Sequence, residues 1–257
     1  MQNFKILTLN CQKGYQPSFR AFFQKILSES QYDFIILQEA NEAVLSIFRE
    51  CQSSYLALNP FDSNLGEKTN ICLLYRNIFS LKESSLTSFA NFNNKFSRGW
   101  GLLVGVFEYM NDRIVVGSVH LHSGIKTSIR LKELEIVKGQ LLKYRNNGCP
   151  IVFGGDFNTG FPGEVASTEN LLSPEFIRAS KTIGATLNSR YTETAPFLLN
   201  RISVILARLG LGFNFRTDHF YIDSATLKTW RCQCQKLLDR VSDHSPVVLI
   251  ISHPTKL

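Results

Sequence analysis

Apolar residues recur along this chain in two spacings, one typical of strands and one typical of helices. Short apolar or alternating runs predict strands at residues 5–9, 33–37, 55–58, 71–75, 102–107, 114–119, 151–153, 219–222, 225–230 and 246–251. Apolar residues at helical spacing predict helices at residues 19–27 (with Ser18 as N-cap), 43–48, 127–144 and 196–209. The polar stretches at residues 62–69, 91–98 and 159–175 are predicted to be loops.

This pattern favours a single mixed domain. The chain has 257 residues, of which 44% are apolar and 19% charged, so it is globular and can bury a large core. Both an α/β arrangement and a sheet-on-sheet arrangement fit the order of the predicted elements. Because no linker or internal repeat interrupts the pattern, we predict one domain over residues 1–257.

The chain is basic, with a net charge of +7 and a pI of about 9.1. A basic protein favours a polyanionic partner, such as nucleic acid or an acidic membrane surface. The lysines and arginines are spread along the chain rather than gathered in runs, so a protein that is merely soluble explains the charge equally well.

The cysteines and the N-terminal segment indicate in which cellular compartment the protein is expected. The six cysteines suggest no disulfide framework, and the C-x-C pair Cys232 and Cys234 is only a weak metal signal. The N-terminal segment MQNFKILTLN is typical of a strand rather than a signal peptide, and no apolar run approaches transmembrane length. We therefore expect a cytoplasmic, reducing setting and a monomer.

Polar side chains stand at the ends of the predicted core strands. The stretch IVFGGDFNTG, residues 151–160, is predicted to be a buried strand that turns at two glycines before a carboxylate and an amide. Taken alone, each such residue could be a turn residue or a solvated charge. Strand ends on one side of a sheet meet at one cleft, however, and eight residues follow this rule. They are Asn10, Glu39, His120, Asp156, Asn158, Asp218, Asp243 and His244.

A cleft lined in this way has two chemical uses. Glu39, with Asn10 and Asp243, offers the oxygen ligands that Mg²⁺ prefers. His244, beside Asp243 or paired with a distant carboxylate such as Asp218, could take a proton from water. A metal that offsets phosphate charge and a histidine that activates water together predict a phosphoester hydrolase.

Six segments in order along the chain resemble the motifs of the endonuclease/exonuclease/phosphatase superfamily, the DNase-I-like fold. The segments GGDFNT and SDHSPV are the most specific matches, whereas LTLNCQ alone would be weak. The six are residues 7–12 (LTLNCQ), 36–40 (ILQEA), 118–123 (SVHLHS), 154–159 (GGDFNT), 216–222 (RTDHFYI) and 242–247 (SDHSPV).

The resemblance implies an α/β four-layer sandwich, with two mainly antiparallel sheets packed face to face and helices outside. It implies cleavage of a P–O bond by in-line attack of water with Mg²⁺, or alternatively Mn²⁺, as cofactor. For the metal, the resemblance implies Glu39, Asn10 and Asp243 as ligands. For the substrate, it implies that Asp156 and Asn158 orient the nucleophile or phosphate and that His120 donates to a phosphate oxygen. It implies that His244 transfers a proton or stabilises the phosphate, oriented by Asp243 or Asp218. Whether Asp156 or His244 is the general base stays open.

Three further residues are weaker matches. Arg98 lies in SRGWGLLVGV, which is similar to a strand common in the family, and could meet a substrate phosphate, as could Arg130. Arg130 could equally be a charge on a helix surface. Glu67 could orient His120, although we favour an ordinary loop position for it.

The departures from the motifs bear on the substrate. Abasic-site endonucleases of the family carry an amide where this chain has His120, so we disfavour that activity. A histidine at this position is similar to the DNase, sphingomyelinase and tyrosyl-DNA phosphodiesterase branches, although His122 replaces the glutamate found in the last of these.

Three functions remain to be weighed. A nucleic-acid phosphodiesterase agrees with the basic pI. A phospholipid or phosphoinositide phosphoesterase agrees with the Arg-punctuated apolar stretch 197–213, although a helix covering a sheet explains that stretch better. A binding module without catalysis is disfavoured, because no metal or histidine position is missing.

Overall fold

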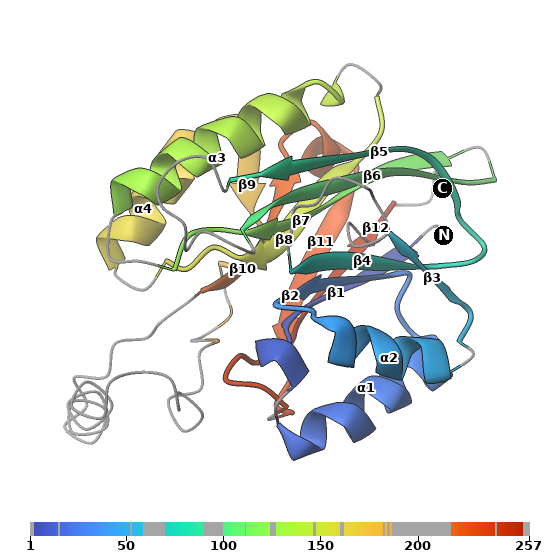
Figure 1. Ribbon diagram of the computed structural model, residues 1–257. Coiled ribbons are helices and arrows are strands. Elements are labelled where there is room, and N and C mark those ends of the chain that lie inside the picture. The colour runs from blue at the N-terminus through green and yellow to red at the C-terminus, as the bar shows by residue number, and fades with distance from the viewer. Residues whose placement is uncertain are drawn as a thin grey trace, which may run out of the picture.

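The protein is a sandwich of two six-stranded sheets with helices on its two outer faces (Figure 1). The computed structural model describes residues 3–14, 16–51, 53–58, 70–89, 100–110, 112–123, 127–145, 148–159, 162–181, 183, 186, 217–239 and 241–253. The predicted four-layer α/β sandwich is thereby confirmed. No helix in these ranges is long and apolar enough to cross a membrane.

The first sheet has the strand order β11-β12-β1-β2-β4-β3. Its central strands β1 and β2 run parallel, and its other neighbouring strands are antiparallel. The strands are β1 (Asn3–Asn10), β2 (Phe34–Gln38), β3 (Tyr55–Leu58), β4 (Ile71–Arg76), β11 (Arg231–Lys236) and β12 (Val247–Ser252).

The second sheet has the order β5-β6-β7-β8-β10-β9 and the same plan. Its central strands β7 and β8 run parallel, and its other neighbouring strands are antiparallel. The strands are β5 (Ser80–Ser88), β6 (Gly101–Tyr109), β7 (Asp112–His120), β8 (Ile151–Asp156), β9 (Phe176–Arg178) and β10 (Asp218–Asp223).

Helices cover the outer face of each sheet (Figure 1). α1 (Pro17–Glu29) and α2 (Glu42–Glu50) pack on the first sheet around Phe19, Phe23 and Val44. α3 (Thr127–Leu142) and α4 (Pro162–Leu172) lie on the second sheet, with Leu134 and Leu141 in a separate apolar cluster. Two short 3-10 helices, η1 (Gln12–Gly14) and η5 (Thr226–Lys228), complete the described elements.

The inner faces of the two sheets form a core that becomes polar at one end. Successive side chains in a strand point to opposite faces, so every second residue faces the other sheet. In five central strands these inward residues are apolar along most of the strand and polar at the same end of the sandwich. The five series are Phe4-Ile6-Thr8-Asn10, Phe34-Ile36-Gln38, Ile114-Val116-Ser118-His120, Val152-Gly154-Asp156 and Ile222-Phe220-Asp218.

Some predicted elements were wrong. Residues 159–175 are not a long loop, because α4 begins at Pro162, and proline is compatible with the first turn of a helix. Residues 225–230 are not a strand but contain η5. The first helix begins at Pro17 with Gln16 as its cap, so Ser18 lies inside the helix.

Three strands were missed and a fourth was drawn too short. The edge strands β5 and β11 and the short strand β9 were not predicted, and β11 reads RCQCQK with largely exposed positions. Strand β8 does not end at Phe153 but continues through both glycines to Asp156. The predicted helix at 196–209 and the predicted loops at 62–69 and 91–98 lie outside the described residues.

Candidate active site

Three predicted site residues form a row across the second sheet. His120 and Asp156 are the last residues of the parallel strands β7 and β8, and they are paired in register. Asp218 is the first residue of β10 and is paired with Asp156. Because neighbours in register point to the same face, all three side chains face the first sheet, and each is at most 4% exposed.

The two glycines before Asp156 are required by close packing. A Cβ on Gly154 would lie 2.5 Å from the Phe220 ring. Gly155 has a φ of +141°, and a Cβ there would overlap the Val119 carbonyl oxygen on β7. The glycines therefore do not form the turn that the sequence suggested. They let strands β7, β8 and β10 approach closely enough to carry the row of side chains.

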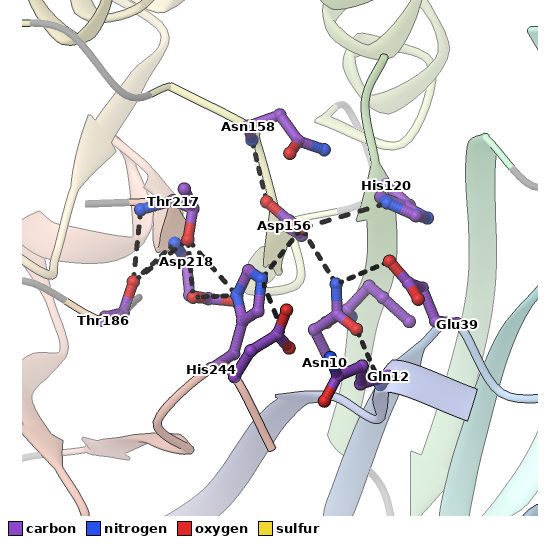
Figure 2. A network of polar contacts seen from close by, with 12 residues as sticks. Asn10, Gln12, Glu39, His120, Asp156, Asn158, Thr186, Thr217, Asp218 and His244 are labelled. Atoms are coloured by element: carbon purple, nitrogen blue, oxygen red, sulfur yellow. Dashed lines mark hydrogen bonds and ion pairs between the residues drawn. The ribbon is translucent and has the colours of Figure 1, made fainter. Parts of the chain in front are cut away.

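Asn10 joins the two sheets at this end of the core (Figure 2). Its amide nitrogen donates to Asp156 Oδ2 at 2.9 Å and to Glu39 Oε1 at 3.4 Å. Its Oδ1 accepts from the Gln12 backbone N–H at 3.0 Å, which fixes the orientation of the amide. Asn10 therefore holds a carboxylate of each sheet through one nitrogen atom.

Glu39 follows β2 directly and takes a left-handed backbone conformation with φ of +52°. This conformation costs a residue with a Cβ on the order of 1 kcal/mol, and such strain is concentrated at functional sites. The side chain is partly exposed, in contrast to the buried row on the second sheet. Glu39 thus places a carboxylate at the rim of the site.

His244 lies between two aspartates of the second sheet, as Figure 2 shows. Its Nδ1 is 2.8 Å from Asp218 Oδ2, and its Nε2 is 3.8 Å from Asp156 Oδ2. Asp243 is the third carboxylate nearby, with Oδ1 4.0 Å from Nε2. Because Nδ1 is bound to Asp218, Nε2 is the nitrogen that faces Asp156.

Burial and neighbouring charges shift the pKa values of this group in different directions. Burial alone would lower the pKa of His244, but the carboxylates of Asp218 and Asp156 outweigh it and hold that pKa well above its ordinary value. Burial would raise the pKa of Asp218, but the His244 charge and several hydrogen bonds lower it overall. Burial dominates for Asp156 and for Asp243, so both of these pKa values are raised.

Asn158 shapes the turn after Asp156. It has a φ of +50°, and its backbone N–H donates to Asp156 Oδ1 at 2.8 Å. Its side-chain amide donates to the Leu121 carbonyl at 2.7 Å, just beyond His120. Asn158 therefore connects the two segments that carry Asp156 and His120.

Two groups of side chains could hold a metal ion. Asp156, Asp218 and His244 bring one ligand atom each within 4.8 Å of one another. In that group Asp218 Oδ2 and His244 Nδ1 bind each other, although Asp218 Oδ1 is buried without a hydrogen-bond partner among the described residues. Glu39 and Asp243, the ligands predicted from the sequence, add carboxylate oxygens at the more exposed side. This oxygen-rich set of four carboxylates fits a hard divalent cation.

Asn10, predicted as a metal ligand, does not present an oxygen atom to the site. As oriented, it presents its amide nitrogen rather than its oxygen to Glu39 and Asp156. It could offer Oδ1 to an ion only by releasing the Gln12 N–H. The structure thus brings together all eight strand-end residues, with Asn10 placed as a connecting residue.

Arg130, one of the two predicted phosphate-binding arginines, does not join this group. Arg98 lies outside the described residues. Arg130 is 3% exposed, forms an ion pair with Glu164 of α4, and donates to the His122 carbonyl at 3.3 Å. It therefore holds the loop after His120 instead of presenting its charge on a helix surface. Glu67 also lies outside the described residues.

Two threonines of the site, Thr186 and Thr217, were not predicted from the sequence. Thr217 Oγ1 donates to Asp218 Oδ2 at 2.9 Å, and it lies next to the predicted aspartate in the segment RTDHFYI. Its position next to a candidate catalytic aspartate is a signal from which Thr217 could have been predicted. Thr186 lies in no motif, and its role follows only from the fold.

Comparison with known proteins agrees with this geometry. The model of the Endonuclease/Exonuclease/phosphatase family matches residues 7–244. No curated protein matches the chain by sequence. Among solved structures, D. rerio TDP2 complexed with a single-strand DNA product has a TM-score of 0.73 at 17% identity, covering 98% of this chain and 100% of that one.

Two other solved structures show the same fold. A functionally unknown conserved protein from Enterococcus faecalis V583 has a TM-score of 0.71 at 18% identity, covering 98% of this chain and 100% of that one. SmcL has a TM-score of 0.69 at 15% identity, covering 97% of this chain and 99% of that one. The family match, the two mixed sheets and the buried Asp/Asp/His cluster lead to one conclusion: the chain belongs to the endonuclease/exonuclease/phosphatase family and has its phosphoesterase fold.

Proposed function

We propose that this protein is a Mg²⁺-dependent phosphodiesterase that hydrolyses phosphoester bonds in nucleic acid, as a nuclease or as an enzyme of the tyrosyl-DNA phosphodiesterase type. The observation that carries the proposal is the position of His244, held by Asp218 at 2.8 Å with its other nitrogen directed at Asp156. A histidine held in this way between two buried carboxylates is suited to proton transfer or charge stabilisation at a reacting phosphate.

The shifted pKa values favour one division of labour between Asp156 and His244. Neighbouring carboxylates raise the pKa of His244 and so favour its imidazolium form, which is suited to donate a hydrogen bond from Nε2 to a phosphate oxygen. A raised aspartate pKa makes the carboxylate a better proton acceptor, so Asp156 is suited to take a proton from the attacking water. Asn158 keeps Asp156 in place through the backbone N–H that it donates to Oδ1.

The remaining predicted residues complete the site. His120 faces the same side and lies with its Nε2 3.9 Å from Asp156 Oδ2, where it can donate to a second phosphate oxygen. Glu39 would be the principal ligand of the metal, with Asp243 close to it and Asn10 holding the Glu39 carboxylate. When bound, Mg²⁺ (or Mn²⁺) would offset the negative charge of the phosphate.

Two observations support nucleic acid as the substrate class. The net charge of +7 favours a polyanion. A protein of the same fold, D. rerio TDP2, has been seen with a single-strand DNA product, and its whole length is covered by this chain. The competing candidate from the sequence, a phospholipid or phosphoinositide, rests on residues 197–213, which lie outside the described ranges.

A substrate panel tests the proposal. The purified protein is assayed with Mg²⁺ on single- and double-stranded DNA, RNA, a 5′-tyrosyl oligonucleotide, sphingomyelin and a phosphoinositide, with and without EDTA. We expect cleavage of a nucleic acid, abolished by EDTA and reduced about 10³-fold by His244→Ala or Asp156→Asn.

The matched control is His253→Ala. His253 follows β12 at the end opposite His244 and contacts Trp230 edge-on, so its replacement should leave turnover unchanged. Cleavage of lipid alone would contradict the nucleic-acid proposal and favour the lipid alternative. Turnover that is indifferent to His244→Ala would contradict the site assignment.

A further inference from the structure

Thr186 connects the two segments that carry Asp218 and His244, and Figure 2 shows its contacts with Thr217 and Asp218. Its hydroxyl oxygen accepts the backbone N–H groups of Thr217 and Asp218, both at 3.1 Å. Its carbonyl oxygen accepts the backbone N–H of Ser245 at 2.8 Å. Thr186 is fully buried, so one residue fixes the start of β10 and the residue after His244.

The hydroxyl groups also form a chain that ends on the Asp218 carboxylate. Thr186 Oγ1 is 3.2 Å from Thr217 Oγ1, and Thr217 Oγ1 donates to Asp218 Oδ2 at 2.9 Å. Because Thr186 Oγ1 accepts two N–H groups, its own proton is left to be donated to Thr217. The direction of donation therefore runs from Thr186 through Thr217 to Asp218.

The same carboxylate oxygen receives the His244 ring. Asp218 Oδ2 accepts from Thr217 Oγ1 and from His244 Nδ1. The position of Oδ2 fixes which ring nitrogen of His244 is bound and which one faces Asp156. Any displacement of the start of β10 would move Oδ2, and the imidazole would lose its orientation.

We propose that Thr186 is a positioning residue for the Asp218–His244 pair. It acts by holding the Asp218 backbone and, through Thr217, the Asp218 carboxylate in the geometry that orients the imidazole. The inference rests on the proposed function for its effect on turnover, but its structural part can be measured without any substrate. Thr186 lies in none of the six segments that resemble the family's motifs.

The test is Thr186→Val, which keeps the shape of the side chain and removes the hydroxyl. Two buried N–H groups lose their acceptor and Thr217 loses its donor. We expect kcat to fall on the order of 10²-fold with KM little changed, because misplacement of a catalytic group by about 1 Å has effects of this size. Thr186→Ser, which restores the hydroxyl, should recover kcat.

Two controls separate positioning from simple loss of stability. Thr168→Val replaces a threonine of α4 that is 2% exposed, and it should leave kcat unchanged. Thr217→Val breaks the hydroxyl chain but keeps the acceptor of both N–H groups, so it should fold even where Thr186→Val does not, with a smaller loss of kcat. In a His244→Ala background, Thr186→Val should cost no further activity.

A spectroscopic measurement tests the structural part independently. The hydrogen-bonded Nδ1 proton of His244 should give a far-downfield proton resonance, identified by its loss in His244→Ala. We expect this resonance to disappear in Thr186→Val and to persist in Thr186→Ser. If the resonance is lost in Thr186→Val and kept in Thr186→Ser while no substrate is turned over, the proposed function fails and the positioning role stands. Normal kcat and an intact resonance in Thr186→Val would overturn the inference.

Discussion

The two sheets of this protein share one plan but hold their site residues in different ways. Each has a parallel pair at its centre, β1 with β2 and β7 with β8, and antiparallel neighbours among the described strands. In both, the polar residues stand at the carboxyl ends of the parallel pair. The second sheet supplies a row of paired strand-end residues, whereas the first supplies residues at or beyond its strand ends.

The difference concerns what fixes each side chain. His120, Asp156 and Asp218 are held by the hydrogen-bond ladder of the second sheet itself. On the first sheet, Glu39 depends on a left-handed backbone, and His244 precedes β12 in a loop. His244 is held by its hydrogen bond to Asp218 of the second sheet, and Glu39 accepts from the Asn10 amide, which also donates to Asp156 of the second sheet. The second sheet is therefore the fixed half of the site, and the first sheet is attached to it through a few polar contacts.

The largest expected effect on stability comes from breaking the contact between His244 and the second sheet. Asp218→Asn keeps the shape of the side chain and removes its charge, which leaves a buried imidazolium with less compensation. Loss of one partner from a buried pair costs about 3 kcal/mol. We expect this decrease in the free energy of unfolding at neutral pH, measured by urea denaturation.

The pH dependence of that decrease follows from the two pKa shifts. The pKa of His244 is raised, so its contribution is present below the ordinary histidine range and is lost as pH rises through the raised value. The pKa of Asp218 is lowered, so its contribution is present above the ordinary aspartate range and is lost as pH falls through the lowered value. The loss of unfolding free energy in Asp218→Asn should therefore be greatest at pH values above the ordinary aspartate range and below the ordinary histidine range. An effect that is constant with pH would contradict the charge-based explanation.

A smaller effect is expected from distorting the fixed half of the site. In Gly155→Ala the new methyl group would overlap the Val119 carbonyl, and the backbone has a φ of +141°. We expect a loss of about 2 kcal/mol in the free energy of unfolding, from overpacking and backbone strain together. Separation of β7 from β8 should also lower turnover, because it separates His120 from Asp156.

The matched control for this substitution is Gly139→Ala. Gly139 lies in α3 and has nothing within 4 Å of an added Cβ, so the change should stabilise the protein by about 0.5–1 kcal/mol. Equal effects of the two substitutions would show that the close contact between β7 and β8 is not needed.

Within the fixed half, the sequence predicted the central strands that carry the site better than the elements around them. Alternation with a period of two identifies inward residues, and a polar residue at the end of such a series marks His120 and Asp156 without knowledge of the fold. The weakly apolar α4 and the edge strand β11 carry little of this pattern, so they were missed or misassigned. The role of Arg130 could not be predicted, because its partner Glu164 lies in α4.

Apart from the pairing of His244 with Asp218, which the sequence offered as one of two alternatives, the contacts between the sheets could not be predicted. Asn10 and Asp156 are 146 residues apart in sequence, and nothing in either motif names the other as a partner. The same holds for Thr186, whose importance depends on the meeting of β10 with the segment before β12. Sequence alone named eight residues that the structure brings together, but the hydrogen bonds that orient them follow from the packing of one sheet on the other.

The smallest of the three effects is expected at the Asn10 contact between the sheets. Asn10→Ala removes the donor to Asp156 and Glu39 and leaves the Gln12 N–H without its side-chain acceptor. A net loss of about 1–2 kcal/mol in the free energy of unfolding is expected for such buried hydrogen bonds.

Asn10→Asp is the informative comparison, because it keeps the acceptor for Gln12 but sets a third carboxylate against Asp156 and Glu39. If Mg²⁺ is held on this side, added Mg²⁺ should restore the stability of Asn10→Asp and have little effect on Asn10→Ala. Equal responses of the two variants to Mg²⁺ would place the ion at the Asp156, Asp218 and His244 group rather than beside Asn10 and Glu39.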